Sequence, residues 1–536
     1  MRVKFWIGVT VALLCVAGVS TNMRADTKHL LTEPMLQNPT ENSVHVVWFT
    51  DTETKDNRVI YGNEQEVMAD SQKLSRMRTF LGKRVSVWRH EGIVTDLPPY
   101  HGKTQERVSY YVESDGIKSE RYYLQAKPQN GTKLNILLTS DGQLMDMVAA
   151  NLEMAEKTVG HIDAVFYAGD LVNIPDQADE WFDMGNANTF FSLMQGNGQK
   201  KLGSKTYQGA AILQEAPFYA AVGNHEYMGR YSDAYDIGLQ FNDVMPDDFN
   251  TISYEELFTM PKSQAGDELY YAETIGDVRL IVLNVTRMWR NNRIGEKSDY
   301  SEDVRSLGNV LMTSGGAVIY EPIKKGSKQY KWLESELDSK EYQDAKYKVV
   351  MFHHQAHGLG LNAIPPFTDP VKKEIRDTNG KLQQILYEYP MEKDYLLHDL
   401  EPLLEKAGVD LVFNGHSHVW NRFRTAQGMN YLESSNVGNS YDAFIDGKER
   451  NEMVPSDLQY FDANDYVLSG DPGGLKPISP LFMDKSVKYI ASNEVTVFSI
   501  LNTQTGIVSS YAYDITKPED GVKKIDYFFV SRNKSR

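Results

Sequence analysis

Five apolar segments of this chain each end in side chains that can bind a metal ion, and this pattern restricts the fold more than any other feature. Each segment has the length and composition of a buried strand. The polar residues at the five ends are Asp141, Asp170, Asn224-His225, His353-His354 and His416-Ser417-His418. Helical patterns lie between several of these segments, as in α/β domains. Because ligands bind beyond the carboxyl ends of strands in open α/β sheets, we expect these distant residues to converge.

The donor types at these strand ends favour a centre with two metal ions. Mixed Asp, Asn and His ligands suit Zn, Fe or Mn better than Ca or Mg. One carboxylate can bridge two ions, and such a pair can activate a water molecule and hold both oxygens of an in-line displacement. The pattern therefore indicates hydrolysis of a phosphate ester. Two other kinds of site find no support, since the sequence contains neither a Gly-x-Ser-x-Gly elbow nor a Walker-type phosphate loop.

Residues 1–25 have the features of a secretory signal peptide. Arg2 and Lys4 precede an apolar run over 5–19, and small residues follow that run. The run is too short to span a bilayer comfortably, so we expect no stable membrane anchor. The only cysteine, Cys15, lies within the signal, which leaves no disulfide in the mature chain. We therefore predict a periplasmic or secreted bacterial protein whose signal peptide is cleaved.

The overall charge limits the partners that the chain can bind. The formal net charge is −17 at pH 7, which argues against a nucleic-acid partner, because such proteins use basic surfaces to neutralise phosphates. A small phosphorylated substrate remains compatible with this charge, since the local charge of a metal ion can outweigh a distant surface field.

A change of pattern near residue 133 divides the chain. Over 28–128, short segments rich in β-branched and aromatic residues, such as 44–49 and 108–112, alternate with turn signals. This spacing predicts a β-sandwich of about 100 residues. Strand and helix patterns alternate afterwards, so we predict an α/β domain over 133–515. Residues 516–536 are predicted to form a C-terminal tail.

In this order, the five strand-end blocks resemble those of the calcineurin-like metallophosphoesterases. Within that superfamily the chain is most similar to the purple acid phosphatases, because of the segment from Gly415 to Arg422 and an N-terminal sandwich like the fibronectin-type-III-like domain of the plant enzymes. The resemblance implies two packed mixed sheets flanked by helices, and acid-phosphatase-like hydrolysis of phosphomonoesters by attack of a metal-bound hydroxide. A phosphodiesterase using the same site, and a non-catalytic metal-binding protein with an incomplete first metal site, remain alternatives.

The resemblance also implies a role for each strand-end residue. Asp170 would bridge two divalent or trivalent ions, whose identity (Fe, Zn or Mn) stays open. The other ligands would be Asp141 and His418 for the first ion, and Asn224, His353 and His416 for the second. His225 would contact the substrate phosphate or transfer a proton to the leaving group.

Two positions depart from the family pattern, and both concern the first ion. Asn173 stands where the purple acid phosphatases carry a tyrosine that binds iron. Gln143 stands where many other relatives carry the histidine of an Asp-x-His block. The first site would then be completed by an amide oxygen of Gln143 or Asn173, or by water.

Three further residues are candidates with open alternatives. Neighbouring residues in extended chain point to opposite faces, so we expect only one of His353 and His354 to bind metal. The family block reads His-x-Pro, with Gln355 here in place of proline, and this register favours His353. His354 or His357 is then a candidate proton donor. Arg422 is predicted to contact the phosphate, or else to brace the loop.

Overall fold

The computed structural model describes most of the chain beyond its N-terminal segment. The described residues are 30–79, 82–102, 107–227, 250–290, 300–306, 310–311, 315–319, 322–360, 367–369, 371–438 and 470–532. The predicted signal peptide, 1–25, lies outside them. Among the helices in these ranges, none combines the length and the apolar character that crossing a membrane requires.

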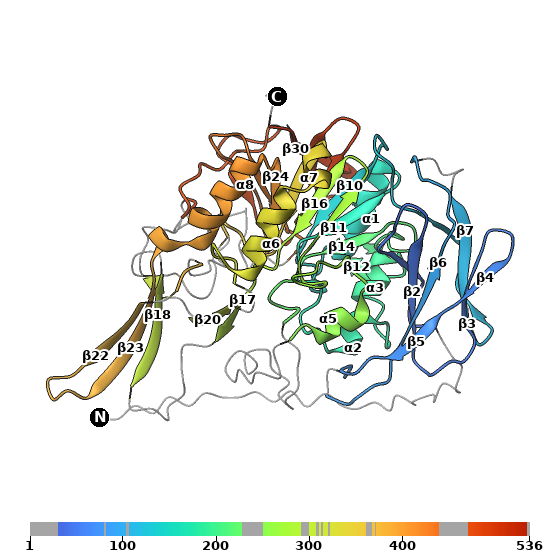
Figure 1. Ribbon diagram of the computed structural model, residues 1–536, viewed down its shortest axis with the longest axis horizontal. Coiled ribbons are helices and arrows are strands. Elements are labelled where there is room, and N and C mark those ends of the chain that lie inside the picture. The colour runs from blue at the N-terminus through green and yellow to red at the C-terminus, as the bar shows by residue number, and fades with distance from the viewer. Residues whose placement is uncertain are drawn as a thin grey trace.

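Two sheets packed face to face form the N-terminal part, drawn in blue in Figure 1. In order, the strands of the first sheet are β1 (Met35–Gln37), β2 (Val44–Thr50), β6 (Trp88–Val94) and β5 (Asp70–Lys73). The second contains β4 (Gln65–Met68), β3 (Asn57–Tyr61), β7 (Val108–Ser114) and β8 (Ile117–Lys118), with β9 (Tyr122–Leu124) also paired to β7. Val46, Trp48, Val59 and Val112 belong to the apolar core that both sheets share.

Strand β2 explains how this sandwich is attached to the rest of the protein. Its side chains alternate between the two faces of the sheet. Trp48 faces the core of the sandwich, whereas Val47 and Phe49 join the main core of the molecule. The ring of Phe49 lies 5.0 Å from that of Phe182 and 5.3 Å from that of Phe191. The sandwich is therefore packed directly against the remainder of the chain.

Two mixed sheets form the centre of the molecule (Figure 1). The first has the order β14 (Phe218–Ala220), β11 (Ala164–Tyr167), β10 (Asn135–Thr139), β28 (Val495–Asn502), β29 (Ile507–Asp514) and β30 (Lys523–Phe529). The second has the order β15 (Tyr271–Ile275), β16 (Val278–Val282), β21 (Tyr347–Met351), β24 (Leu411–Asn414), β26 (Asn430–Ser434), β25 (Trp420–Arg424) and β27 (Tyr489–Ile490).

Successive side chains of the central strands point to opposite faces, so that each sheet packs against the other sheet on one face and against helices on the other. Leu280 of β16 and Phe413 of β24 belong to the core that the sheets share, whereas Ile281 and Val412 belong to a second core. The second core also includes residues of the outer helices α6 (Lys328–Leu337), α7 (Lys340–Asp344) and α8 (Glu401–Ala407). Helix α1 (Val148–Val159) contacts β28 of the first sheet. The predicted class, a β-sandwich followed by an α/β domain, is confirmed.

The remaining described elements lie in the long connections. They are α2 (Ala178–Trp181), α3 (Phe190–Met194), β12 (Lys200–Leu202), β13 (Lys205–Tyr207), α5 (Ile252–Leu257), β17 (Arg287–Arg290), β18 (Ser301–Ser306), β19 (Val310–Leu311), β20 (Gly315–Ile319), β22 (Val371–Arg376), β23 (Leu382–Tyr389) and short 3-10 or π turns at Met391–Lys393, Leu396–Leu400 and Pro518–Asp520. Strands β18, β22 and β23 form an arm that projects from the molecule in Figure 1.

The predicted C-terminal tail is wrong for residues 523–529. Residues 523–529 form β30, which pairs with β29 as the last strand of the first central sheet. Val530 just after it is fully buried. The apolar residues there were too few to show a period in the sequence, and the strand depends on the partner that β29 supplies. The other predicted domain boundaries stay predictions.

Candidate metal centre

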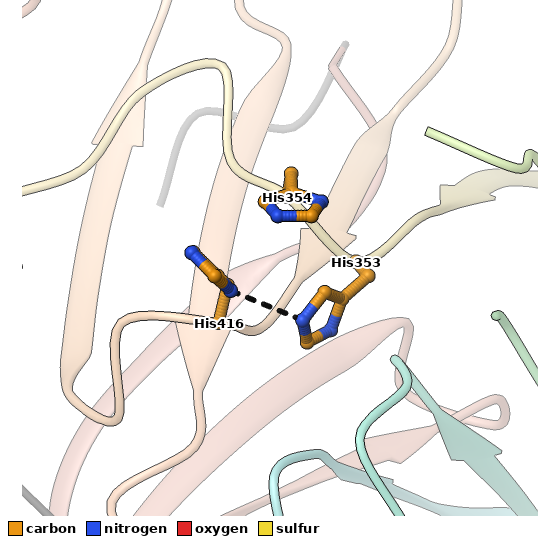
Figure 2. Close-up of side chains that lie close together, drawn as sticks. All are labelled: His353, His354 and His416. Atoms are coloured by element: carbon orange, nitrogen blue, oxygen red, sulfur yellow. Dashed lines mark hydrogen bonds between the residues drawn. The ribbon is translucent and has the colours of Figure 1, made fainter. Parts of the chain in front are cut away.

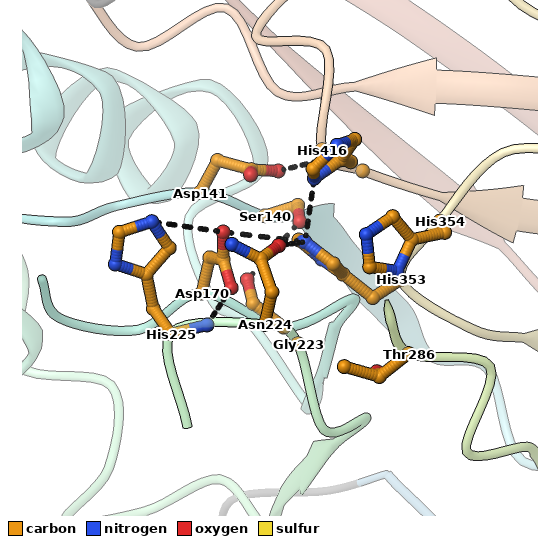
Figure 3. A network of polar contacts seen from close by, with 12 residues as sticks. Ser140, Asp141, Asp170, Gly223, Asn224, His225, Thr286, His353, His354 and His416 are labelled. Atoms are coloured by element: carbon orange, nitrogen blue, oxygen red, sulfur yellow. Dashed lines mark hydrogen bonds and ion pairs between the residues drawn. The ribbon is translucent and has the colours of Figure 1, made fainter. Parts of the chain in front are cut away.

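The five predicted strand ends meet at one edge of the two central sheets. Strands β10, β11 and β14 of the first sheet lead to Asp141, Asp170 and Asn224-His225, and β21 and β24 of the second lead to His353-His354 and His416 (Figure 3). Parallel pairing of β10 with β11, β11 with β14 and β21 with β24 brings their carboxyl ends together. The structure thus unites the residues that the sequence predicted to converge.

The backbone at this edge is held in unfavourable conformations. Asp141, Asp170, His416 and His418 all have positive φ, at 55°, 56°, 81° and 59°. Non-glycine residues rarely adopt this region, and such residues cluster at functional sites where the surroundings impose the strain. Glycine is required alongside, since a Cβ on Gly223 would lie 2.2 Å from Oδ1 of Asp170. The loops are therefore shaped to bring these side chains together.

Three donor groups surround Nε2 of His353, which is assigned to the second ion. Its Nε2 lies 3.2 Å from Oδ2 of Asp170, 3.0 Å from Oδ1 of Asn224 and 3.2 Å from Nδ1 of His416. Its Nδ1 lies 2.7 Å from the carbonyl oxygen of Ala168, which can only accept, so in the neutral ring the proton is on Nδ1 and Nε2 presents a lone pair to a metal ion. This set fits a metal ion.

Fewer donor groups lie close together at the place assigned to the first ion. Nε2 of His418 lies 3.3 Å from Oδ1 of Asp141, and the donor atoms of Asp141, Asp170 and His353 lie within 4.8 Å of one another. Gln143 is buried, and its Oε1 accepts no hydrogen bond from the part of the chain that the structure describes. Buried polar atoms normally have a hydrogen-bond partner. A buried amide oxygen without one, in the loop that carries Asp141, is therefore compatible with a role as a ligand of the first ion.

Asn173 is tied to the loops around the site instead. Its side-chain nitrogen donates to the carbonyl oxygen of Gln143 at 2.8 Å, and its own carbonyl oxygen lies 2.7 Å from Nδ1 of His225. Its backbone N–H donates to the buried carboxylate of Glu180. Of the two amides considered for the first ion, these contacts favour Gln143, and they give Asn173 a part in orienting His225.

The charges of the site favour a cation between its carboxylates. Burial acts to raise the pKa of Asp170, but the imidazoles of His353 and His225 outweigh burial and lower that pKa below its usual range. Burial likewise acts to lower the pKa of His353, but Asp170 outweighs burial and raises the pKa to about 10, so that without a metal ion a proton on Nε2 supplies the positive charge beside Asp170. For His416, burial and the neighbouring imidazoles lower the pKa, which keeps the ring in the neutral form that binds metals.

His225 is placed to act on a substrate. It is 9% exposed, more than Asp141, Asp170, Asn224, His353, His416 or His418. With Nδ1 on the Asn173 carbonyl, its Nε2 faces the centre, 3.8 Å from Oδ2 of Asp170. Its backbone N–H donates to Oδ1 of Asp170 at 2.9 Å, which fixes its position beside the bridging carboxylate.

Two buried carboxylates that the sequence did not reveal support the ligand loops. Glu226 accepts from the backbone N–H groups of Asp170, Leu171 and Gly223 at 2.7–2.9 Å. Glu433, on β26, accepts from the N–H of Ser417 between the two histidines at 2.8 Å. Burial raises the pKa of Glu226 to about 7 and that of Glu433 well above the usual value. Only the position of Glu226 beside Asn224-His225 was a signal in the sequence.

Arg422 makes its described contacts with strand β30. Its Nε lies 2.8 Å from Oδ2 of Asp526, and its guanidinium lies over the ring of Phe528 at 4.9 Å. Both partners belong to β30. These contacts favour the alternative of an arginine that braces the structure, here by joining β25 to β30, and the phosphate contact stays a prediction.

The contacts of His357 favour a structural role over that of a proton donor. Its Nδ1 lies 2.6 Å from Oδ2 of Asp471, and its Nε2 lies 2.7 Å from Oε2 of Glu401. Burial acts to lower its pKa, but these two carboxylates outweigh burial and raise the pKa to about 9. Tyr431 donates to Glu401 at 2.8 Å and completes the network. A charged imidazole therefore links three segments of the chain.

This network predicts a loss of stability at alkaline pH. Because the pKa of His357 is raised from 6.5 in the unfolded chain to about 9, its contribution is complete below pH 6.5 and is lost as pH rises through 9. The free energy of unfolding should fall by about 3 kcal/mol over that window. Urea unfolding across the window measures this. In a His357→Gln variant this fall in unfolding free energy should be absent. Equal pH dependence in the two proteins would contradict the assignment of the raised pKa to His357.

The chain is similar to known proteins in sequence and in fold. The family model for calcineurin-like phosphoesterases matches residues 134–420. Purple acid phosphatase 18 of Arabidopsis thaliana is 23% identical over 274 residues, a match that takes in 50% of this chain and only 41% of that protein's length. The structure of purple acid phosphatase PPD1 from yellow lupin (Lupinus luteus) seeds has a TM-score of 0.52 and 15% identity, over 92% of this chain and 73% of that one, which indicates a shared fold. The structure of PhoD gives a TM-score of 0.42 at 11% identity, over 92% and 91% of the two chains.

The family match covers more than half of the chain and contains all the strand ends that meet at the centre. The relatives named agree with the purple acid phosphatase resemblance of the sequence. This chain therefore belongs to the calcineurin-like phosphoesterase family, with purple acid phosphatases among its homologues.

Proposed function

We propose that this protein is an exported, metal-dependent phosphatase that hydrolyses phosphomonoesters at a centre of two ions. The observation that carries the proposal is the position of Asp170. Its carboxylate lies 3.2 Å from Nε2 of His353 in the second ligand set, and its donor atoms lie within 4.8 Å of those of Asp141 in the first. A carboxylate between two such sets is the requirement for bridging two ions.

The residues of the chain divide the work of hydrolysis. When bound, the two ions would supply an activated water and hold the phosphate oxygens. His225 directs Nε2 toward the centre and is oriented by the carbonyl of Asn173, so it is placed to contact the phosphate or to pass a proton to the leaving oxygen. The mixed Asp, Asn, Gln and His donors suit Fe, Zn or Mn.

The proposal that the protein is exported rests on its N-terminal sequence. Arg2 and Lys4 before the apolar run, and the lack of cysteine beyond Cys15, support a cleaved signal peptide. Mass spectrometry of the protein from a periplasmic fraction tests this, and a retained Met1 would argue against it.

Hydrolysis of two chromogenic esters tests the substrate class. With Zn, Mn or Fe supplied, we expect kcat/KM for p-nitrophenyl phosphate to exceed that for bis-p-nitrophenyl phosphate by at least about tenfold, a difference of about 1.4 kcal/mol in transition-state stabilisation. A chelator should abolish both activities. The reverse preference would identify a phosphodiesterase, and no turnover with any of these ions would identify a non-catalytic metal-binding protein.

A further inference from the structure

His354 lies within the metal centre, although the family pattern assigns no ligand there. The donor atoms of His353, His354 and His416 lie within 4.8 Å of one another, and all three side chains are buried (Figure 2). The ring of His354 has its centroid 4.1 Å from that of His416 and 5.0 Å from that of His353. Strand β21 ends at Met351 and the chain bends at both histidines, so the alternation that predicted opposite faces no longer applies.

The hydrogen bond of His354 leaves its other nitrogen suited to a metal. Nδ1 lies 3.0 Å from the carbonyl oxygen of Val285, which can only accept, so Nδ1 carries the proton. In the neutral ring Nε2 then presents a lone pair. His353 has the same arrangement, with Nδ1 on the carbonyl of Ala168 and Nε2 among the other ligands. A carbonyl partner of this kind fixes the tautomer and ring orientation of metal-binding histidines.

The same contacts argue against the proton donor that the sequence suggested for His354. The one proton of the neutral ring is already donated to Val285, and the side chain is fully buried. A nearby metal cation would disfavour the doubly protonated ring. His225, which is more exposed and faces the bridging carboxylate, is better placed for proton transfer.

We propose that His354 binds the second metal ion through Nε2. The proposal rests on the two-ion centre of the proposed function. It gives the second ion three imidazoles, from His353, His354 and His416, whereas the first ion has only that of His418. Because imidazole suits Zn, Fe and Ni whereas carboxylate and carbonyl oxygens suit Mn and Mg, the second site should select the former ions more strongly than the first.

Proton NMR of the full chain loaded with Co²⁺ tests this directly. Each histidine bound to paramagnetic Co²⁺ retains one ring N–H, whose resonance is displaced far outside the normal range and disappears in D₂O. His353, His416 and His418 would give three such resonances, and a bound His354 adds a fourth. We expect four in the wild type and three in His354→Gln. A His161→Gln control, at a half-exposed histidine away from the centre, should keep four.

The outcomes separate this proposal from the one on which it rests. Three displaced resonances in the wild type would mean that His354 lies beside the ions but does not bind them. This result would overturn the inference without any need for a folded variant. The same four resonances in His354→Gln would also overturn it. If no displaced resonance were seen, the two-ion centre itself would be contradicted, and with it the proposed phosphatase activity.

Discussion

Asp170→Asn is expected to abolish hydrolysis while leaving the fold intact. The substitution keeps the size of the side chain and removes the charge that would be shared between the two ions. A bound metal ion typically supplies several kcal/mol of transition-state charge stabilisation. A loss of about 3–5 kcal/mol corresponds to a fall of about 10²–10⁴-fold in kcat/KM. Asparagine can still accept from the N–H of His225, now at 2.9 Å from Oδ1, so the loop that carries His225 should keep its position.

Turnover of p-nitrophenyl phosphate and metal content measured on the same samples check this expectation. The variant should bind fewer than two ions per chain. Its metal-free form should remain folded but unfold at a lower temperature than the metal-free wild type, because the buried imidazole of His353 loses the Asp170 carboxylate 3.2 Å away. Asp146→Asn makes the same chemical change at an exposed carboxylate paired with Lys200 and should have no effect on either measurement. If Asp170→Asn retained activity within about tenfold of the wild type, a loss of only about 1.4 kcal/mol, the bridging position would be assigned wrongly.

The central fold was predictable because its strands are defined by local pattern. The segment 164–167 is apolar throughout and forms β11, and the helical period over 327–337 corresponds to α6. Strand β30 escaped prediction because its residues alternate only partly, in KKIDYFF, and its formation depends on pairing with β29. Information of that kind lies in tertiary contacts and not in a local window.

The ligands were predictable for a different reason. Asp141, Asp170 and His416 follow apolar strands directly, and the sheet edge collects whatever follows its strands. Long-range partners decided the remaining roles. Arg422 follows the paired histidines as the family's arginine does, yet Asp526 on β30 determines its contact. His357 is likewise fixed by Glu401 and by Asp471, more than a hundred residues away.

The role of Glu433, whose carboxylate supports a ligand loop, could not be predicted from the sequence either. Glu433 lies on β26 in the stretch Asn430–Ser434, where nothing in the sequence distinguishes it from an ordinary strand residue. Only parallel pairing with β24, which sets Asn414 opposite Glu433, brings its carboxylate to the N–H of Ser417. A residue two steps removed from a metal ligand therefore depends on the register of the sheet.

Glu226→Gln is expected to weaken both the fold and the metal centre. Oε2 of Glu226 accepts from the N–H groups of Asp170 and Gly223, and Oε1 accepts from that of Leu171. An amide has only one oxygen, so its NH₂ group must face at least one of these buried N–H groups. Leaving such a donor unsatisfied costs about 1–3 kcal/mol of unfolding free energy. Because Asp170 has a positive φ, its loop needs this support to stay in place.

Chelator competition and denaturant unfolding of the metal-free protein separate the two effects of Glu226→Gln. We expect metal affinity to fall by about 10–100-fold, as for other residues that hold ligands in place, together with a loss of about 2 kcal/mol in unfolding free energy. Glu268→Gln is the matched control, since burial also raises the pKa of Glu268 to about 7 but its carboxylate lies 3.3 Å from Nζ of Lys262. It should leave metal affinity unchanged. Wild-type metal affinity in Glu226→Gln would contradict this role. It would show that the neighbouring strands hold the positive-φ conformation of Asp170 without the carboxylate of Glu226.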